Sequence, residues 1–389
     1  MSLPLPPIPS WSSALIAALV GFGGTVALVV QAMRTLGASV EETGSAVTVL
    51  CLGIALAGAV LSYRSRMPIV LAWSTPGAAL LAVTTPGLSW PVAIGVFVAA
   101  ALMTIVLAAV PWLGRLAERI PAAIASAMLA GVLLPFCLRL FGHATADPLL
   151  VVVVVAVFLI ARQRAPLYAL LLVLVADVAL TILRGQVGAL PEGATFGVLQ
   201  PVLPEFDLRA ILSLGLPLFL VTLVSQNLAG LVVLRSAHYQ PKAGALLAGC
   251  GVASLLAAPF GGFAVNLAAI TAAICTNPDA HPDHDRRWVV GILYAFFYLL
   301  LAAFAPVLVR LFLALPEAVI AVLIGAALIP ALVAALETTL RDKDSRDAAI
   351  VTFLATGSGL TLFGLGSAFW GLVVGMSALG VRAWLPRLG

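Results

Sequence analysis

Charged residues are scarce in this sequence. Only 9% of its 389 residues are charged, while 62% are hydrophobic. A soluble domain carries about 25% charged and about 45–50% apolar residues, so the composition excludes a soluble enzyme or a soluble binding module. It predicts instead a polytopic membrane protein whose surface meets the lipid bilayer.

Cysteine is rare as well, and no cysteine motif is present. Cys51, Cys137, Cys250 and Cys275 each lie in an apolar run without CxxC spacing. Such cysteines are typical of small packing residues, so neither disulfides nor metal ligands are expected. The basic residues behind the net charge of +4 are scattered through short loops, which argues against a nucleic-acid partner. The N-terminal stretch MSLPLPPIPSW has no basic residue, so we expect no cleaved signal peptide.

What the sequence does contain is a series of long apolar runs. A membrane-spanning helix needs about 20 such residues, and charged residues, prolines and glycines delimit fourteen candidate segments. The longest polar connection, 185–209, follows the seventh segment and divides the chain into two sets of seven. The segments are 12–34, 43–63, 68–85, 90–110, 120–140, 147–161, 166–184, 210–234, 241–258, 259–276, 288–310, 315–336, 346–363 and 365–384.

Lysine and arginine orient these segments. If the N-terminus is cytoplasmic, fifteen of these basic residues fall in inner loops and five in outer ones, which is the bias expected of a protein in the cell (inner) membrane. Both termini are then cytoplasmic. Because seven is odd, the second half enters the membrane inverted relative to the first. An all-α inverted repeat of this kind is a common plan for secondary transporters.

The third segment is interrupted at mid-span. It contains RMPIVLAWSTPGAALL, which opens with a proline, continues with residues unsuited to a helix and ends in a short helix-forming run. Pro76 suits the first turn of a new helix and not the interior of an existing one, and Ser74 or Thr75 is a suitable N-cap. We therefore predict a short strand followed by a half-helix over 76–84.

The tenth segment predicts a matching element. It contains APFGGFAVNLAAITAAI, in which FGGFAV is expected to be extended and Asn266 to be the N-cap of a half-helix over 267–275. An open strand edge cannot face lipid, so the two short strands are expected to pair near the middle of the membrane. The N-terminal ends of both half-helices then meet there.

The meeting point of the two half-helices is the candidate binding site. Helix N-termini carry unsatisfied N–H groups and partial positive charge, which favour anions. Neutral polar side chains and aromatic rings surround this point, and Gly261 and Gly262 allow close backbone approach. These groups suit a small aromatic or apolar carboxylate. The candidate substrate-binding residues are Phe22, Thr25, Trp73, Ser74, Thr75, Gln226, Asn227, Gly261, Gly262, Phe263 and Asn266.

Plainer interpretations of the same residues stay open. A single STPG could be only a helix kink, because glycine and proline are common in membrane helices. Gln226 and Asn227 could join helices by hydrogen bonds, and Trp73 and Phe263 could be packing residues.

Asp177 is the one acid predicted to lie deep within a span, in the seventh segment. Ionisable residues at that depth are functional suspects, so Asp177 is the candidate proton carrier, with a structural hydrogen-bonding role as the alternative. The polar loop NPDAHPDHDRR at 277–287 is rich in residues able to bind a metal. Solvated charge is its simpler interpretation, and no metal or other cofactor is expected.

The stretches RMPIVLAWSTPGAALL, PFGGFAVNLAAITAAIC and NPDAHPDHDRRW resemble the benzoate:proton symporter family, over essentially the whole chain. The resemblance implies a uracil-permease-like fold of seven plus seven inverted segments. It implies a core domain (1–110 and 210–310) and a gate domain (111–209 and 311–389), with the substrate between them at the third and tenth segments. It also implies uptake of a small aromatic carboxylate with protons by an elevator-like movement of core against gate.

One feature departs from the wider fold. Nucleobase transporters place acidic residues in the eighth and tenth segments, whereas this chain has Gln226, Asn227 and Asn266 there. A carboxylate substrate has only acceptors and is repelled by an acid, so neutral amides suit an anion. The same difference removes the obvious proton-coupling site.

Three functions compete at this point. The leading one is proton-coupled import of benzoate or a similar acid. An anion exchanger or channel of the same fold, for another small anion or a nucleobase-like substrate, is the alternative, and flux insensitive to a proton gradient would favour it. An intramembrane enzyme is not expected, because the sequence has no HExxH motif and no Ser–His pair at depth. The sequence leaves open whether the chain forms a homodimer.

Overall fold

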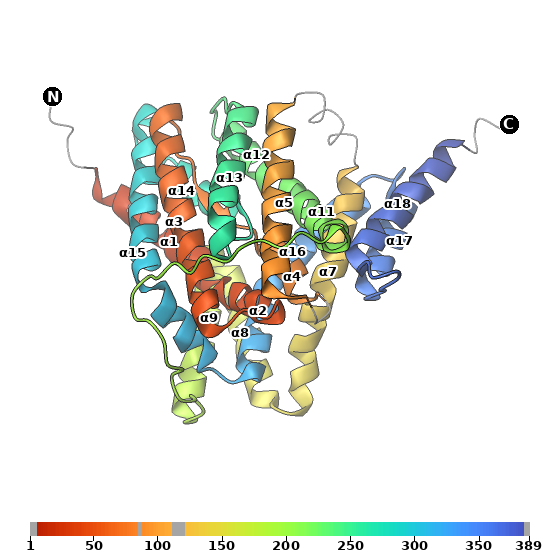
Figure 1. The fold of residues 1–389 in the computed structure, drawn as a ribbon. Helices are drawn as coiled ribbons and strands as arrows, with labels where there is room; N and C mark the ends of the chain where they lie inside the picture. Colours follow the sequence, from red (N-terminus) through yellow and green to blue (C-terminus); the bar gives the residue numbers. More distant parts are fainter. Residues whose placement is uncertain (1–5, 85–87, 111–120, 385–389) are drawn as a thin grey trace.

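The computed structural model describes residues 6–84, 88–110 and 121–384. These residues form a bundle of helices around one two-stranded sheet (Figure 1). The first half contains α1 (Ile8–Gly23), α2 (Val26–Thr35), α3 (Val40–Ser65), β1 (Leu71–Trp73), α4 (Thr75–Ala82), α5 (Trp90–Ala109), α7 (Ala122–Gly142), α8 (Pro148–Arg164) and α9 (Ala169–Leu183).

The second half repeats the pattern of long helices around one broken segment. It contains α10 (Leu208–Ala210), the π-turn η3 (Ile211–Gly215), α11 (Leu216–Thr222), the π-turn η4 (Leu223–Leu228), α12 (Ala229–Ser236), α13 (Ala243–Ala257), η5 (Ala258–Phe260), β2 (Val265–Leu267), α14 (Ile270–Thr276), α15 (Trp288–Leu313), α16 (Glu317–Arg341), α17 (Arg346–Gly357) and α18 (Ser367–Trp384).

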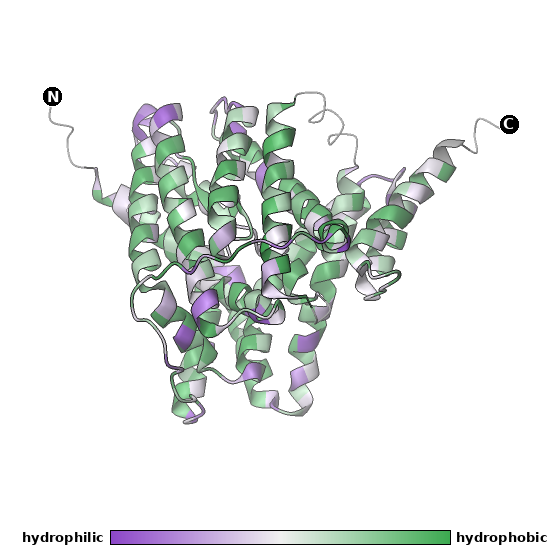
Figure 2. Cartoon of the chain, in the orientation of Figure 1, coloured by the Kyte–Doolittle hydropathy of each residue, from purple (hydrophilic) through white to green (hydrophobic). Residues whose placement is uncertain are grey.

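The helices follow the predicted segments closely. Each of the fourteen segments has a helical counterpart, although the first is split into α1 and α2 and the eighth runs from α10 to α12. Within the described ranges, eight helical runs are long and apolar enough to cross a membrane. Figure 2 shows hydrophobic residues along the helices and hydrophilic residues mainly at their ends and in the connections. The chain is therefore a mostly helical, multi-pass membrane protein.

Helices from the two halves of the chain pack together in two groups. In one group, α3 packs against α13 and α15, and α5 packs against α13. In the other, α7 packs against α16 and α17, and α16 also contacts α8 and α9. In Figure 1 α3, α13 and α15 stand side by side, while α17 and α18 lie at the opposite side of the view. Each group thus combines elements that lie far apart in the sequence.

The polar connection 185–209 is fastened along the first group. Gly197 N donates to Ala303 O of α15 at 2.8 Å, and Glu205 N donates to Pro91 O of α5 at 2.9 Å. A Cβ atom at Gly95 would lie 2.0 Å from Glu205 O, so only glycine lets the connection pass so close to α5. The predicted loop 185–209, called the strap below, is therefore held against α5 and α15 by backbone hydrogen bonds.

Candidate functional site

Two short strands, β1 and β2, pair inside the bundle and form the two-stranded sheet that is called the ribbon below. β1 and β2 are antiparallel, with Leu71 opposite Leu267, Ala72 opposite Asn266 and Trp73 opposite Val265. One further backbone bond beyond the strands, from Ala268 N to Val70 O at 3.0 Å, extends the pairing. The prediction that the strands of the third and tenth segments pair with each other is confirmed.

Side chains from α3 and α15 satisfy the backbone on the β1 side of this ribbon. The Tyr294 hydroxyl of α15 donates to Leu71 O at 2.9 Å. The Ser62 hydroxyl of α3 lies 3.0 Å from both N and O of Ile69, just before β1. Unpaired backbone groups cost several kcal/mol in a lipid environment, so these bonds allow non-helical chain to lie inside the bundle.

The β2 side is supported in the same way. Val265 N donates to the Ser254 hydroxyl of α13 at 2.8 Å. Leu267 N donates to the Asn227 side-chain oxygen at 3.1 Å. Asn227 is buried in the π-turn η4, so its oxygen serves the backbone of β2. A π-turn widens the helix locally and is frequent at functional sites; the neighbouring Gln226 is half-buried in the same turn.

The first half-helix begins as the sequence predicts. Ser74 is the N-cap of α4, and its fully buried hydroxyl accepts a bond from Gly77 N at 2.9 Å. Thr75 is the first residue of α4, and Pro76 occupies the first turn. The Thr222 hydroxyl of α11 donates to the Ser74 hydroxyl at 3.0 Å. This connects the eighth segment to the third.

The second half-helix begins later than predicted, and Asn266 is not its N-cap. α14 starts at Ile270, after Ala269, which makes no side-chain cap bond. Asn266 lies in the middle of β2. The prediction was wrong because pairing with β1 continues to Ala268, so the chain is still extended where the helix was expected to start. The antiparallel register also places the starts of α4 and α14 beyond opposite ends of the ribbon, so the two N-termini do not meet side by side.

Instead of capping α14, Asn266 occupies an unusual position in the middle of β2. It is fully buried, yet neither its side-chain nitrogen nor its oxygen has a hydrogen-bond partner among the residues that the structure describes. Leaving a buried polar group unpaired costs about 1–3 kcal/mol. The hydrogen-bonding groups of this amide are not used by the described residues, so they are free to bind a ligand.

The faces of the ribbon differ. Side chains of directly opposed residues share a face, so Asn266 lies on the face of Ala72. Leu71 and Val265 belong to the other face, where they approach glycines of α3. Ala72 is the one β1 residue that is only half-buried, whereas Asn266, on the same face, is fully buried.

An aromatic cluster gathers the candidates of the first and third segments. Trp73 Nε1 donates to the Thr25 hydroxyl at 2.8 Å, and the Phe22 and Trp73 rings are 5.5 Å apart in an edge-to-face arrangement. Thr25 lies at the break between α1 and α2. The Tyr298 ring lies 6.3 Å from Trp73, and the Tyr294 ring lies 4.7 Å from Tyr298.

The two tyrosines of α15 were not predicted from the sequence. They stand four residues apart in YAFFY, a spacing that places both hydroxyls on one helix face. Both are buried. A pair of hydroxyls on one face of an apolar helix is the signal that could have identified them.

The remaining candidates lie apart from this cluster. Gly261 has a φ of +94°, and a Cβ there would lie 2.9 Å from Trp90, so it forms a tight turn against α3 and α5. A Cβ at Gly262 would lie 2.5 Å from the Cβ of Ala257. The Phe263 ring lies 6.2 Å from that of Phe97 in α5. The structure thus uses these three candidates to pack the turn before β2.

Asp177 is fully buried on α9. Within the described part of the chain, neither carboxyl oxygen has a hydrogen-bond partner. The helix itself packs against α1, where a Cβ at Gly24 would lie 3.1 Å from Leu170. Asp177 therefore lies on a helix that touches the break beside Thr25.

The polar loop 277–287 is held by hydrogen bonds within the protein. His281 Nδ1 accepts from Asp283 N at 3.1 Å, and the His284 ring stacks on Tyr239 with centroids 4.2 Å apart. Across the described residues, no three His, Cys, Asp or Glu side chains gather as a metal site.

Solved structures of similar shape show the fold. The transmembrane domain of a cyanobacterium bicarbonate transporter, BicA, matches with a TM-score of 0.57 at 14% identity, covering 94% of this chain and 97% of that one. The murine solute carrier 26 family member A9 anion transporter, in its inward-facing state, matches with a TM-score of 0.64 at 14% identity, covering all of this chain and 70% of that one. The chain has the fold of these membrane transporters.

Sequence comparison gives the family. The model of the benzoate membrane transport protein family matches residues 7–381. The chain is 36% identical over 363 residues to the benzoate membrane transport protein of Acinetobacter baylyi, covering 93% of this chain and 92% of that protein. It is 38% identical over 374 residues to the inner membrane protein YdcO of Escherichia coli, covering 95% and 94%. The chain belongs to the benzoate membrane transport family and is therefore a membrane transport protein.

Proposed function

We propose that this protein is a secondary active transporter that imports benzoate, or a similar small aromatic carboxylate, together with protons across the inner membrane. The observation that carries the proposal is the buried amide of Asn266, which has no partner among the described residues, in the ribbon that joins two half-helices. Family membership supports the substrate class, since a relative at 36% identity is named a benzoate membrane transport protein.

The chemistry of the ribbon suits a carboxylate. The substrate oxygens only accept hydrogen bonds, and the Asn266 side chain offers two N–H donors. No acid of the eighth or tenth segment, 210–234 or 259–276, is present to repel an anion. Trp73 is opposed to Val265 and therefore lies on the opposite face of the ribbon from Asn266. The aromatic cluster of Phe22, Trp73 and Tyr298 packs the ribbon against the α1–α2 break and does not line the face that holds Asn266.

The proton in this proposal is carried by Asp177. Its carboxyl is buried without a partner, and an unpaired charge there is costly. Protonation removes that cost, and the helix that carries Asp177 touches the α1–α2 break near the aromatic cluster. A structural role for this carboxyl is the alternative, and it needs hydrogen-bond partners that the described residues do not supply.

The movement in this proposal is that of a core domain (1–110 and 210–310) against a gate domain (111–209 and 311–389). The two groups of packed helices support it, because α3, α5, α13 and α15 belong to the proposed core and α7, α8, α9, α16 and α17 to the gate. All fourteen segments span the membrane in a seven-plus-seven inverted repeat, with both termini cytoplasmic. Cysteines introduced at the exposed positions Glu192 and Lys343 are then labelled from opposite faces of intact cells.

One observation favours a second candidate function. Two solved structures of this fold are a bicarbonate transporter and an anion transporter. Anion exchange, or passive anion flux without protons, is therefore the alternative.

The deciding experiment uses the purified protein in lipid vesicles. Benzoate, uracil and sulfate are compared for direct binding, and benzoate uptake is then measured with and without an inward proton gradient. Saturable benzoate binding with gradient-driven accumulation supports the proposal. Benzoate flux that ignores the gradient supports the alternative, and binding of uracil or sulfate in preference to benzoate contradicts the proposed substrate.

A further inference from the structure

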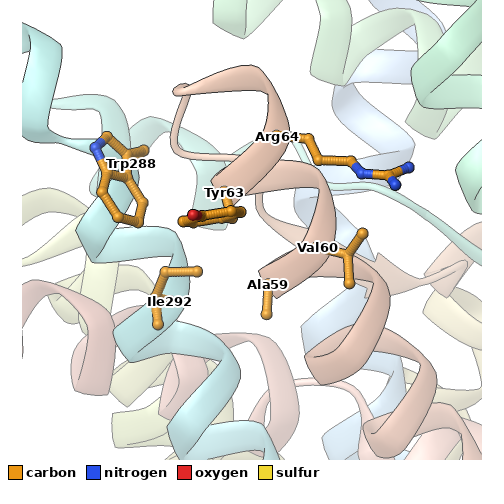
Figure 3. A pocket seen from close by; sticks show the side chains of 6 residues that line it. All are labelled: Ala59, Val60, Tyr63, Arg64, Trp288 and Ile292. Atoms are coloured by element: carbon orange, nitrogen blue, oxygen red, sulfur yellow. The ribbon is translucent and has the colours of Figure 1, made fainter.

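A shallow groove lies between the last turns of α3 and the first turns of α15. Its volume is about 500 Å³. Figure 3 shows Tyr63 and Trp288 facing each other across the two helices, with Arg64 directed away from Trp288. The residues that line it are Ala59, Val60, Tyr63, Arg64, Trp288 and Ile292.

Arg66 forms a cationic cap on the two rings. It ends α3 in the left-handed conformation, with φ 54° and ψ 31°, which costs a non-glycine residue about 1 kcal/mol or more. Its guanidinium carbon lies 4.8 Å from the Tyr63 ring centroid and 4.5 Å from that of Trp288. Cation–π contacts with both rings hold the strained residue in place.

No acid in the described ranges neutralises the positive charge of this cap. Arg64 and Arg66 are both exposed, and neither forms an ion pair with any acid in the described ranges. Below the cap, the floor of the groove is apolar through Ala59, Val60 and Ile292. The groove therefore changes from cationic to apolar along α3.

This order of groups matches one kind of molecule. Tyrosine and tryptophan of membrane proteins lie at the headgroup level of the bilayer, so the cap faces phosphates and the floor faces acyl chains. We propose that the groove binds one anionic glycerophospholipid, with its phosphate on Arg66 and an acyl chain along Val60 and Ile292. The unpaired cations supply the preference for an anionic headgroup over a zwitterionic one.

The test compares two lipids of identical acyl chains, phosphatidylglycerol and phosphatidylcholine, on the purified full-length protein. Retained lipid is counted by native mass spectrometry, and thermal stability is recorded with each lipid added. Phosphatidylglycerol is expected to be retained in preference. Loss of one cation near an anionic headgroup weakens its binding about fivefold, so Arg66→Gln should lower phosphatidylglycerol retention by that factor.

The matched control is Arg164→Gln, which removes an exposed arginine at the end of α8, away from the groove. Arg66→Gly provides a variant that keeps the fold, because glycine accepts the left-handed conformation without cost; it should lose the lipid preference while remaining as stable as the parent without lipid. Equal retention of the two lipids overturns the proposal. The proposal is also overturned if Arg66→Gln and Arg164→Gln retain equal amounts of phosphatidylglycerol. It is overturned as well if Arg66→Gln keeps the lipid but loses self-association of the protein.

Discussion

The third and tenth segments carry the same interruption but finish it differently. In the third, Ser74 caps α4 and is itself bonded to Thr222. In the tenth, α14 has no side-chain cap, and the polar residue of the strand, Asn266, is buried without a partner. A polar side chain that is fully bonded stabilises a fold, whereas one that is buried and unbonded weakens it. In the proposed function, the third segment therefore stabilises the ribbon and the tenth contributes the side chain that binds the ligand.

The largest expected effect is at Asn266. Asn266→Asp should abolish measurable benzoate binding at neutral pH, because it sets a second negative charge against the carboxylate. Asn266→Ala should weaken binding by about 1–3 kcal/mol, the usual cost of losing a buried polar partner. Isothermal titration of the purified variants measures both, with the exposed amide variant Gln163→Ala as the control. Normal benzoate binding by Asn266→Asp would contradict the assignment of the binding site to the tenth segment and place the substrate elsewhere.

The next effect concerns Asp177, whose buried carboxyl also lacks a hydrogen-bond partner among the described residues. Asp177→Asn keeps the shape of the side chain but cannot take up a proton to become neutral. We expect this variant to bind and exchange benzoate and to lose accumulation driven by an inward proton gradient. Uptake into vesicles under an inward proton gradient measures accumulation, and counterflow without a gradient measures binding and exchange. Full accumulation by the variant would remove Asp177 as the carrier.

A smaller effect is expected at Ser74. Ser74→Ala removes an N-cap, which costs about 0.5–2 kcal/mol, and it leaves the Thr222 hydroxyl without its acceptor. The variant should unfold at a lower temperature in detergent, while Asn266→Ala should unfold no earlier than the parent. Ser12→Ala, at an exposed position of α1, serves as the reference. If Ser74→Ala and Asn266→Ala lower the unfolding temperature equally, the proposal that the third segment stabilises the ribbon and the tenth binds the ligand is wrong.

The smallest effect lies outside the ribbon, where α8 and α9 are joined by a partly exposed ion pair. Arg184 Nη1 lies 2.5 Å from the Asp147 carboxyl, and this hydrogen bond holds the pKa of Asp147 below its ordinary value. A carboxyl with a lowered folded pKa stabilises the protein above its unfolded pKa, and this stabilisation is lost as the pH falls through the folded pKa.

Asp147→Asn keeps the N-cap and removes the charge. It should lower stability by at most about 1 kcal/mol at neutral pH, and the difference should vanish in acid. Thermal unfolding from neutral to acidic pH measures it. The control is Asp207→Asn, at an N-cap that forms no ion pair within the described ranges. A difference that persists in acid would show that the pair does not act through charge.

The sequence by itself determined the membrane class, the positions of the helices and the break in the third segment. These follow from local chemistry: apolar runs must be helical in lipid, and Pro76 with Ser74 starts a new helix whatever surrounds it. The motifs predicted the benzoate transport family, and the family comparison confirms that membership; benzoate as the substrate of this chain stays a proposal. Proton coupling stays a prediction, because no local pattern specifies it.

The tertiary structure alone decided how the tenth segment ends. Asn266 is a good N-cap by residue type, but the hydrogen bond from Ala268 to Val70 keeps the chain extended beyond it. That bond joins residues far apart in the sequence, so no local preference could show it. The same holds for Tyr294, which bonds Leu71, and for the strap across α5. Backbone that is not helical within the bundle must find partners, and only the packed fold shows where those partners are.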